Sequence, residues 1–393
     1  MESSTLVLLC MLSFISILIG RHVLFGGRQR LPGPARIPIL GNHFPTTVPI
    51  WEALRNYSKE FGPVYSLRIL GIDIVVATTS GACRELTEAR SSVFSGRRAP
   101  KMAELAGMYE GILFQPDPVR LRQGRKFLAS GLQPTPLKAY QPVIHRNIVT
   151  FLQRVLTSPT NIYDTIPILA TGVSLEITYG YHVSGLEDQF VQRARISVNR
   201  FVSATALSLK DGFLVSLLPF LAYIPSFLPG MSFKRTAEEW SRTAVVNAAE
   251  GFNMVTENMR NGSARPCLLQ KALEAKDGTY EDIVLMRTAA QVYSGGSDTT
   301  SSALKTFVLA MTLYPEVQAK AQADIDRHMG GRLPSYAADH EDLPAILHDE
   351  AVFPDHEVFR PERWLDSTIL QKHDVDPLDI VFGFGRRHVL FLP

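Results

Sequence analysis

A carboxylate followed directly by two hydroxyls lies in the second half of the chain. Residues 295–300 read Gly-Gly-Ser-Asp-Thr-Thr, which places Asp298 beside Thr299 and Thr300. Proton delivery to a reacting atom needs a hydroxyl close by and a carboxylate behind it, so this run is a candidate catalytic site. The structural alternative is a loop joining two helices, because glycine, serine and aspartate are common turn residues.

The flanks of this run favour one long helix. Apolar residues recur with helical period from Ile283 to Leu313, and Pro315 can open a following helix as a first-turn proline. Gly295 and Gly296 each cost roughly 1 kcal/mol against alanine inside a helix, and Ser and Thr hydroxyls can bond back to the carbonyl four residues earlier. The sequence therefore predicts a helix with a local widening at its centre.

A second run lies near the end of the printed sequence. Residues 382–387 read Phe-Gly-Phe-Gly-Arg-Arg, and His388 and Val389 follow. Glycines let a backbone pass close to another group. Taken alone, the run could be an ordinary basic turn, so its interpretation depends on the rest of the chain.

The first run resembles the oxygen-activation motif of the cytochrome P450 monooxygenases, Ala/Gly-Gly-x-Asp/Glu-Thr-Thr/Ser. All its specified positions match, at Gly295, Gly296, Asp298, Thr299 and Thr300. The resemblance implies that this helix crosses above a haem b cofactor and that its opened groove holds dioxygen. It also implies that Thr299 steadies the bound oxygen and that Asp298 relays protons.

The second run resembles the haem-binding loop of the same family, Phe-x-x-Gly-x-Arg-x-Cys-x-Gly. Phe382, Gly385 and Arg387 fall on its first three fixed positions, but Val389 falls on the cysteine that ligates the iron. A thiolate pushes electron density onto haem iron, whereas valine has no lone pair, so the sequence offers no metal ligand there. His388 is a conceivable substitute ligand, and an exposed histidine is the structural alternative.

Two further segments carry the resemblance. Arg125 matches the arginine of a Trp-x-x-x-Arg helix that pairs with a haem propionate, although Leu121 replaces the tryptophan. A solvated basic face is the alternative, and the same basic cluster could dock an acidic reductase. Residues 359–364 match the Phe-x-Pro-Glu-Arg-aromatic segment, in which Arg363 would join a Glu-x-x-Arg pair. The sequence lacks that pair. The segments that flank the Glu-x-x-Arg helix in the family are recognisable here, but they join directly at residues 344–345.

Length and composition predict a large globular protein. The 393 residues are 46% hydrophobic with a formal net charge of +2, which favours neither disorder nor nucleic-acid binding. The three cysteines, Cys10, Cys83 and Cys267, are too few and too scattered for a disulfide framework or a zinc site, which suits a reducing compartment.

The N-terminus predicts a membrane anchor. No residue from Ser3 to Gly20 is charged, and a helix of that length spans ~27 Å, close to the hydrocarbon thickness of a bilayer. The competing secretory signal lacks a basic start and a cleavage site. The arginines that follow place the body in the cytosol, and the proline-rich stretch after the anchor resembles the hinge of microsomal cytochromes P450. We therefore expect a single-pass protein of the endoplasmic reticulum membrane.

The remaining pattern predicts a mainly α protein with small β-sheets (α+β). A hairpin is expected from residues 64–70 and 74–77 around Gly71, and helices are expected at 83–94, 119–132, 142–156, 188–201 and 236–259. The predicted domains are an anchor (1–25), a proline-rich hinge (26–46) and an internally truncated cytochrome P450 domain (47–393), incomplete near 344–345 and at the C-terminus.

Residues 213–231 are strongly apolar but contain Pro219, Pro225 and Pro229, which argue against a second membrane span. One interpretation is a buried loop. The other, favoured by the resemblance, is a lid that touches the bilayer surface and admits apolar substrates.

The resemblance implies a monooxygenase that inserts one oxygen atom of O2 into a hydrophobic secondary metabolite or xenobiotic. Electrons would come from NADPH through a cytochrome reductase. The alternatives are a catalytically inactive, haem-free variant that only binds an apolar ligand or the reductase, and a transcript variant with no stable product. The sequence does not identify the substrate, because apolar pockets discriminate by small energies.

Overall fold

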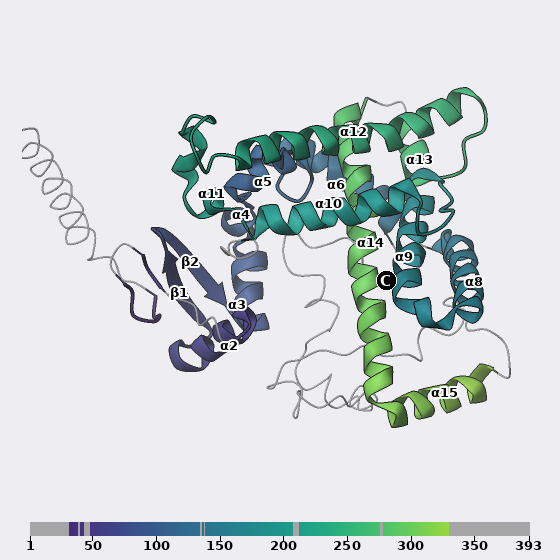
Figure 1. Ribbon diagram of the computed structural model, residues 1–393, viewed down its shortest axis with the longest axis horizontal. Helices are drawn as coiled ribbons and strands as arrows, with labels where there is room; N and C mark the ends of the chain where they lie inside the picture. The colour runs from purple at the N-terminus through teal and green to yellow at the C-terminus, as the bar shows by residue number, and fades with distance from the viewer. Residues whose placement is uncertain are drawn as a thin grey trace, which may run out of the picture. The chain divides into compact units, whose positions relative to one another are not determined.

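The computed structural model describes residues 31–329, apart from 38–39, 43–47, 134–135, 137, 207–211 and 276–277. The predicted anchor, the segment around Arg363 and the predicted haem-binding loop lie outside these residues. The described part is mostly helical with one pair of strands, which confirms the mainly α class (Figure 1). Within it we find no helix that combines the length and the apolar character needed to cross a bilayer.

Contacts divide the chain after Glu85 into two units. In the first, α2 (Ile50–Phe61) precedes the antiparallel strands β1 (Val64–Ile69) and β2 (Ile72–Ala77). Leu70 and Gly71 between the strands have φ of 46° and 87°, as a tight two-residue turn requires. The predicted hairpin is therefore confirmed.

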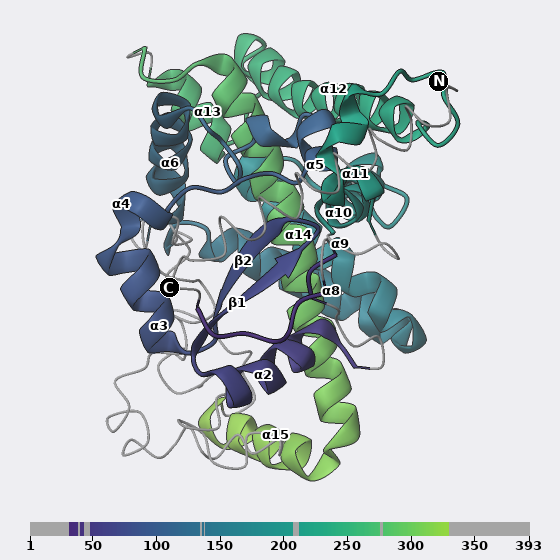
Figure 2. The same cartoon turned by 90° about the vertical axis from the view of Figure 1, so that its left-hand side faces the viewer.

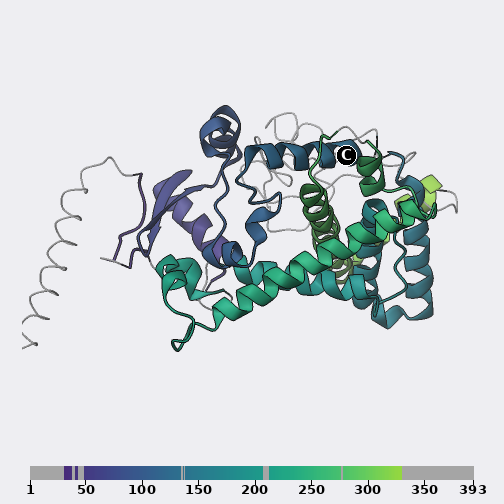
Figure 3. The same ribbon diagram turned by 90° about the horizontal axis from the view of Figure 1, so that it is seen from above.

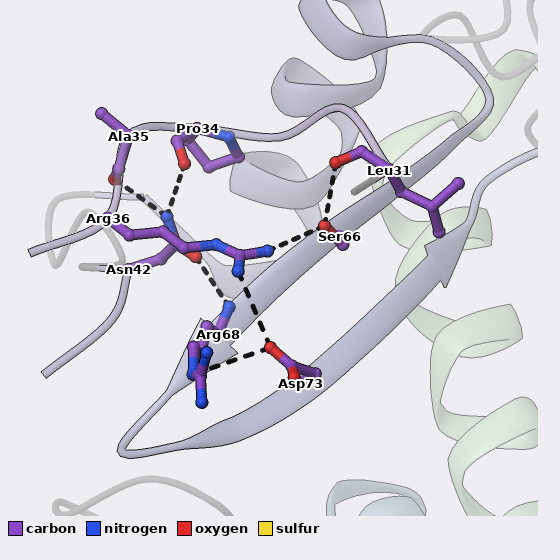
Figure 4. Close-up of polar contacts among 8 residues, drawn as sticks. All are labelled: Leu31, Pro34, Ala35, Arg36, Asn42, Ser66, Arg68 and Asp73. Atoms are coloured by element: carbon purple, nitrogen blue, oxygen red, sulfur yellow. Dashed lines mark hydrogen bonds and ion pairs between the residues drawn. The ribbon is translucent and has the colours of Figure 1, made fainter. Parts of the chain in front are cut away.

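The described part of the proline-rich stretch is fixed to this hairpin (Figure 4). Asn42 donates to the carbonyls of Pro34 and Ala35, both at 2.9 Å, and accepts from the Arg68 amide at 2.7 Å. A Cβ at Gly33 would lie 2.1 Å from the Ser66 carbonyl oxygen, so only glycine allows this approach.

The helix predicted at 83–94 is broken. The chain forms α3 (Ser80–Arg84), a π-helical segment (Glu85–Ala89) and α4 (Ser91–Phe94). Arg90 between the last two has φ −111° and ψ 27°, which is outside the helical region and ends the ladder of hydrogen bonds.

The second unit is built from helices. In chain order they are α5 (Lys101–Leu105), α6 (Pro118–Leu132), α8 (Gln141–Thr157), α9 (Ile162–Tyr179), α10 (Gln189–Thr205), α11 (Leu214–Leu217), α12 (Phe233–Arg260), α13 (Leu268–Glu274), α14 (Asp282–Leu313) and α15 (Pro315–Met329), with short 3-10 turns at Met108–Glu110, Pro159–Asn161 and Pro219–Tyr223. Five of these confirm predicted helices to within about four residues. The sequence did not reveal α9, because it is buried on nearly all sides and shows little amphipathic period.

Helix α14 is the axis of this unit. Helices α10 and α12 cross it, and α9 packs along it with α8 beyond (Figures 1 and 3). Helices α6 and α13 contact α14 and each other near its start (Figure 2). The buried core between them includes Phe127, Leu175, Phe190 and Tyr293, so α14 is held from several sides.

The apolar segment 213–231 forms α11, a 3-10 turn and a loop before α12. Phe227 and Tyr223 are each 83% exposed, whereas Val215 is buried. The buried-loop interpretation is therefore wrong for the tip of this segment. An exposed apolar tip agrees with a lid.

Candidate functional site

The run at residues 295–300 lies inside one uninterrupted α-helix, α14, which excludes the loop interpretation. The Thr299 hydroxyl donates to the Gly295 carbonyl at 2.8 Å, and the Ser294 hydroxyl donates to the Ala290 carbonyl at 2.9 Å. These bonds do not break the helix, and the predicted local widening stays a prediction. A carbonyl oxygen has two lone pairs, so it can accept a hydroxyl and still keep its helical N–H partner.

The two glycines of the run face different surroundings. A Cβ at Gly296 would lie 2.5 Å from the Ser174 hydroxyl oxygen on α9, so this glycine permits close helix packing. A Cβ at Gly295 would meet nothing within 4 Å, because Gly295 lines a cavity. The motif therefore combines a packing position with an open wall.

That cavity, which we call the large cavity, has a volume of about 490 Å³. It lies among α10, α12, α14 and the loop before α6. Its lining includes the apolar side chains of Met108, Ile112, Phe201, Trp240, Ala244 and Ala290, and also Asp298 and Thr299. A site of this size and character suits a hydrophobic small molecule, with the Asp–Thr pair at one wall.

Polar contacts close the wall of the large cavity. Arg287 on α14 pairs with Glu110, and the Gln291 side-chain carbonyl accepts from the Ile112 amide at 2.8 Å. These contacts tie the loop before α6 to α14. The charged lining residue Arg287 is therefore already neutralised.

The opposite wall is tied in the same way. Arg200 on α10 pairs with Glu239 on α12 at 3.0 Å and lies over the Trp240 ring, 5.8 Å from its centroid. A second pair, Arg193 with Glu250, joins the same two helices. Burial raises the pKa of Tyr293, another lining residue, to about 12, so its hydroxyl stays neutral at physiological pH.

A second, small cavity of about 190 Å³ lies among α9, α10 and α14. Its lining is largely polar, with Asp164, Gln192, Arg195, Ser301, Ser302 and Lys305 among its residues. Asp298 lines both cavities. Its exposed carboxylate makes no hydrogen bond or ion pair with any described residue.

The other predicted site residues are not gathered at this wall. Thr300 is exposed on α14 and lines neither cavity. Arg125 is half-buried on α6. Phe382, Gly385, Arg387 and Val389 lie outside the described residues, so their roles stay predictions.

Neither described cysteine fits a haem iron. Cys267 is 1% exposed, caps α13 by accepting the Gln270 amide at 3.4 Å, and packs in the core. The pKa of its thiol is raised by burial, as is that of Cys83 in the other unit. A thiolate ligand needs a lowered pKa and an open approach. Among the described residues, therefore, no cysteine offers a thiolate for the haem that the family implies, and residue 389 lies outside them.

Several lining residues were not found from the sequence. Trp240, Ala244 and Asn247 follow helical spacing on α12, which marks one face but not what that face meets. Met108 and Ile112 lie in a loop whose path no periodicity fixes. Only the α14 residues carried a recognisable signal, the motif itself.

Comparison with known proteins identifies the lineage. The family model described as cytochrome P450 matches residues 31–344. Cytochrome P450 monooxygenases 226 and 208 of Postia placenta are 31% and 30% identical, over 92% and 93% of this chain and 77% and 81% of their own lengths. Cytochrome P450 monooxygenase COX2 of Coprinopsis cinerea is 26% identical over 92% of this chain and 78% of its own length.

These alignments extend over 413, 423 and 418 positions, more than the 393 residues of the chain, so parts of each relative have no counterpart here. The family match also ends at residue 344, where the sequence predicts a missing helix. The match nevertheless covers most of the chain and includes the whole wall of the large cavity. The chain belongs to the cytochrome P450 family and is, by that resemblance, an oxidoreductase of the monooxygenase type.

Proposed function

We propose that this chain binds a hydrophobic organic molecule, such as a secondary metabolite or a xenobiotic, as the substrate of a cytochrome P450 monooxygenase reaction. In that reaction one oxygen atom of O2 enters the substrate, and electrons come from NADPH through a reductase. The supporting observation is the large cavity, whose apolar lining ends at Asp298 and Thr299.

The chain's own residues account for the substrate side of this reaction. The apolar lining removes the bound molecule from water, and the paired Arg287 and Arg200 leave little uncompensated charge in the wall. Asp298 can take a proton from the small cavity and present it beside the Thr299 hydroxyl. For the iron side, the sequence places Val389 at the expected cysteine position and leaves His388 as a conceivable substitute ligand.

The membrane setting belongs to the same proposal. An N-terminal anchor in the endoplasmic reticulum membrane would hold the cytosolic body near the bilayer, and the exposed Phe227 and Tyr223 suit contact with lipid. The basic start of α6 is a candidate reductase surface. Part of it is already engaged, since Arg120 pairs with Glu281 at 3.0 Å, while Arg122 is exposed.

Val389 and the buried Cys267 favour a second candidate function. In it the chain is a haem-free variant that keeps the cavity and binds an apolar ligand or the reductase without turnover. Both candidates share ligand binding and differ only in the metal centre.

A carbon monoxide difference spectrum of the reduced protein separates the two candidates. A thiolate-type Soret band from the chain as it stands supports the monooxygenase. A histidine-type spectrum, or no haem, leaves the second candidate. Val389→Cys is the matched variant, because it restores only the missing sulfur. A thiolate-type band in that variant alone would assign the loss to residue 389.

A further inference from the structure

Asn247 is an unpaired amide in the apolar wall of the large cavity. It lies on α12, one turn after Thr243 and Ala244, and its side chain is half-buried. Its amide makes no hydrogen bond or ion pair with any described residue. An amide in this position can donate two hydrogen bonds and accept two.

Most other polar groups in this wall already have partners. Arg200 and Arg287 are in ion pairs, and the side-chain carbonyl of Gln291 accepts the Ile112 amide. The Ser294 hydroxyl is bonded to its own helix. Among the described lining residues, Asn247 is therefore the amide whose donors and acceptor all remain available to a ligand, with the Ser197 hydroxyl as a smaller companion on α10.

The physical consequence concerns which apolar molecules the cavity accepts. Without ligand, water can satisfy the Asn247 amide. A pure hydrocarbon that fills the cavity displaces this water and leaves the amide unpaired, which costs binding free energy. A molecule with a carbonyl or hydroxyl oxygen at the matching place replaces the lost hydrogen bond. Sites that hydrogen-bond a substrate discriminate far more strongly than purely apolar ones.

We propose that Asn247 anchors a hydrophobic molecule that already bears a carbonyl or hydroxyl oxygen, so that the preferred substrate class is an oxygenated hydrocarbon. The inference rests on the proposed function, since it concerns the occupant of the same cavity. It gives α12 a specificity-determining side chain that makes no hydrogen bond or ion pair with Asp298 or Thr299 in the described structure.

Trp240 supplies a readout that needs no haem. It lines the large cavity on the same face of α12 as Asn247, so its fluorescence should respond to a bound molecule. The probes are cyclododecanone and cyclododecane, which share one carbon skeleton and differ in one oxygen. Titration of the full chain should give about tenfold tighter binding of the ketone. Trp240→Phe should abolish the signal and thereby assign it to the cavity.

The decisive variant is Asn247→Leu, which keeps the side-chain shape but removes both hydrogen-bonding groups. We expect it to weaken ketone binding about tenfold and to leave or improve hydrocarbon binding. Asn253→Leu is the matched control, because Asn253 is exposed on the same helix and does not line the cavity. Asn247→Ala, checked by circular dichroism, guards against a leucine-specific packing defect.

The outcomes distinguish the role proposed for Asn247 from the ability of the large cavity to bind a ligand. Equal affinity of the wild type for both probes, or an unchanged ketone preference in both Asn247 variants, overturns the role proposed for Asn247. Either result leaves the proposed function standing. Failure of both probes to bind the wild type overturns the ligand-binding function as well.

Discussion

The two cavities beside Asp298 differ in how their walls are held. In the large cavity both lining arginines are held in ion pairs, Arg287 with Glu110 and Arg200 with Glu239, and Asp298 is the charged lining residue that it shares with the small cavity. In the small cavity, Asp164 and Lys305 make no hydrogen bond or ion pair with another described residue. Pairing suits a wall that must stay apolar, whereas unpaired charges suit a space filled with water. The wall of the large cavity is therefore held together by contacts of the fold, whereas the small cavity resembles an inlet from solvent.

Breaking a wall pair of the large cavity should have the largest effect. Glu110→Ala leaves the Arg287 guanidinium, 15% exposed, without its carboxylate, and its Nε already lacks a partner among the described residues. Because Glu110 is 35% exposed, we discount the cost of a fully buried pair and expect a loss of about 2–3 kcal/mol in the free energy of unfolding, measured by urea denaturation.

The matched change in the small cavity is Lys305→Ala, which should alter stability by less than about 0.5 kcal/mol. Adding Arg287→Met to Glu110→Ala should recover much of the loss, since no charge is then stranded. Equal losses for Glu110→Ala and Lys305→Ala would erase the distinction between the two walls.

The adjacent glycines offer a finer test. Gly296→Ala places a Cβ 2.5 Å from the Ser174 hydroxyl oxygen and should cost about 1 kcal/mol, after an offsetting gain in helix propensity. Gly295→Ala meets open space and should stabilise the fold by about 0.5–1 kcal/mol. Thermal unfolding should therefore separate the two variants by about 2 kcal/mol.

Ser174→Ala completes a double-mutant cycle with Gly296→Ala. It removes the oxygen that the new methyl group would strike and should restore stability. A destabilising effect of Gly295→Ala as large as that of Gly296→Ala would contradict the assignment of one glycine to packing and the other to the open wall.

The dependence of stability on alkaline pH tests how far the wall of the large cavity is shielded from water. Burial raises the pKa of Tyr293 from 10.0 to about 12, so above pH 10 the folded state holds a proton that the unfolded state loses. Stability is full below pH 10 and falls as the pH rises toward 12, by about 1.4 kcal/mol at pH 11. Tyr293→Phe should remove this part of the loss in urea denaturation series. Tyr179 would still contribute, because burial raises its pKa as well.

The sequence predicted α14 and the hairpin well because each carries a local signal. Periodicity identified the bounds of α14 to within one residue, and Gly71 marked the turn. It did not predict α9, whose ten buried residues leave no polar face for a periodic pattern. The broken segment at residues 83–94 also looked like one helix, because nothing in the sequence marks Arg90 as non-helical.

The candidate site was predictable only where its chemistry is contiguous in the chain. Asp298 and Thr299 are neighbours in a motif, whereas Trp240, Asn247 and Ile112 reach the same cavity from separate elements. Their convergence depends on how α10 and α12 cross α14, which is a tertiary property. The difference between Gly295 and Gly296 depends likewise on Ser174, which is remote in sequence.

The smallest expected effect concerns the carboxylate that the two cavities share. Asp298 is exposed and has no partner among the described residues, so Asp298→Asn should change the free energy of unfolding by less than about 0.5 kcal/mol. Asp188→Asn is the matched control, because Asp188 is 5% exposed and one of its oxygens accepts from Tyr181 and Ser184. That change should cost about 1–3 kcal/mol. If Asp298→Asn proved as costly, the fold itself would require this carboxylate, and its position between the cavities would need no functional explanation.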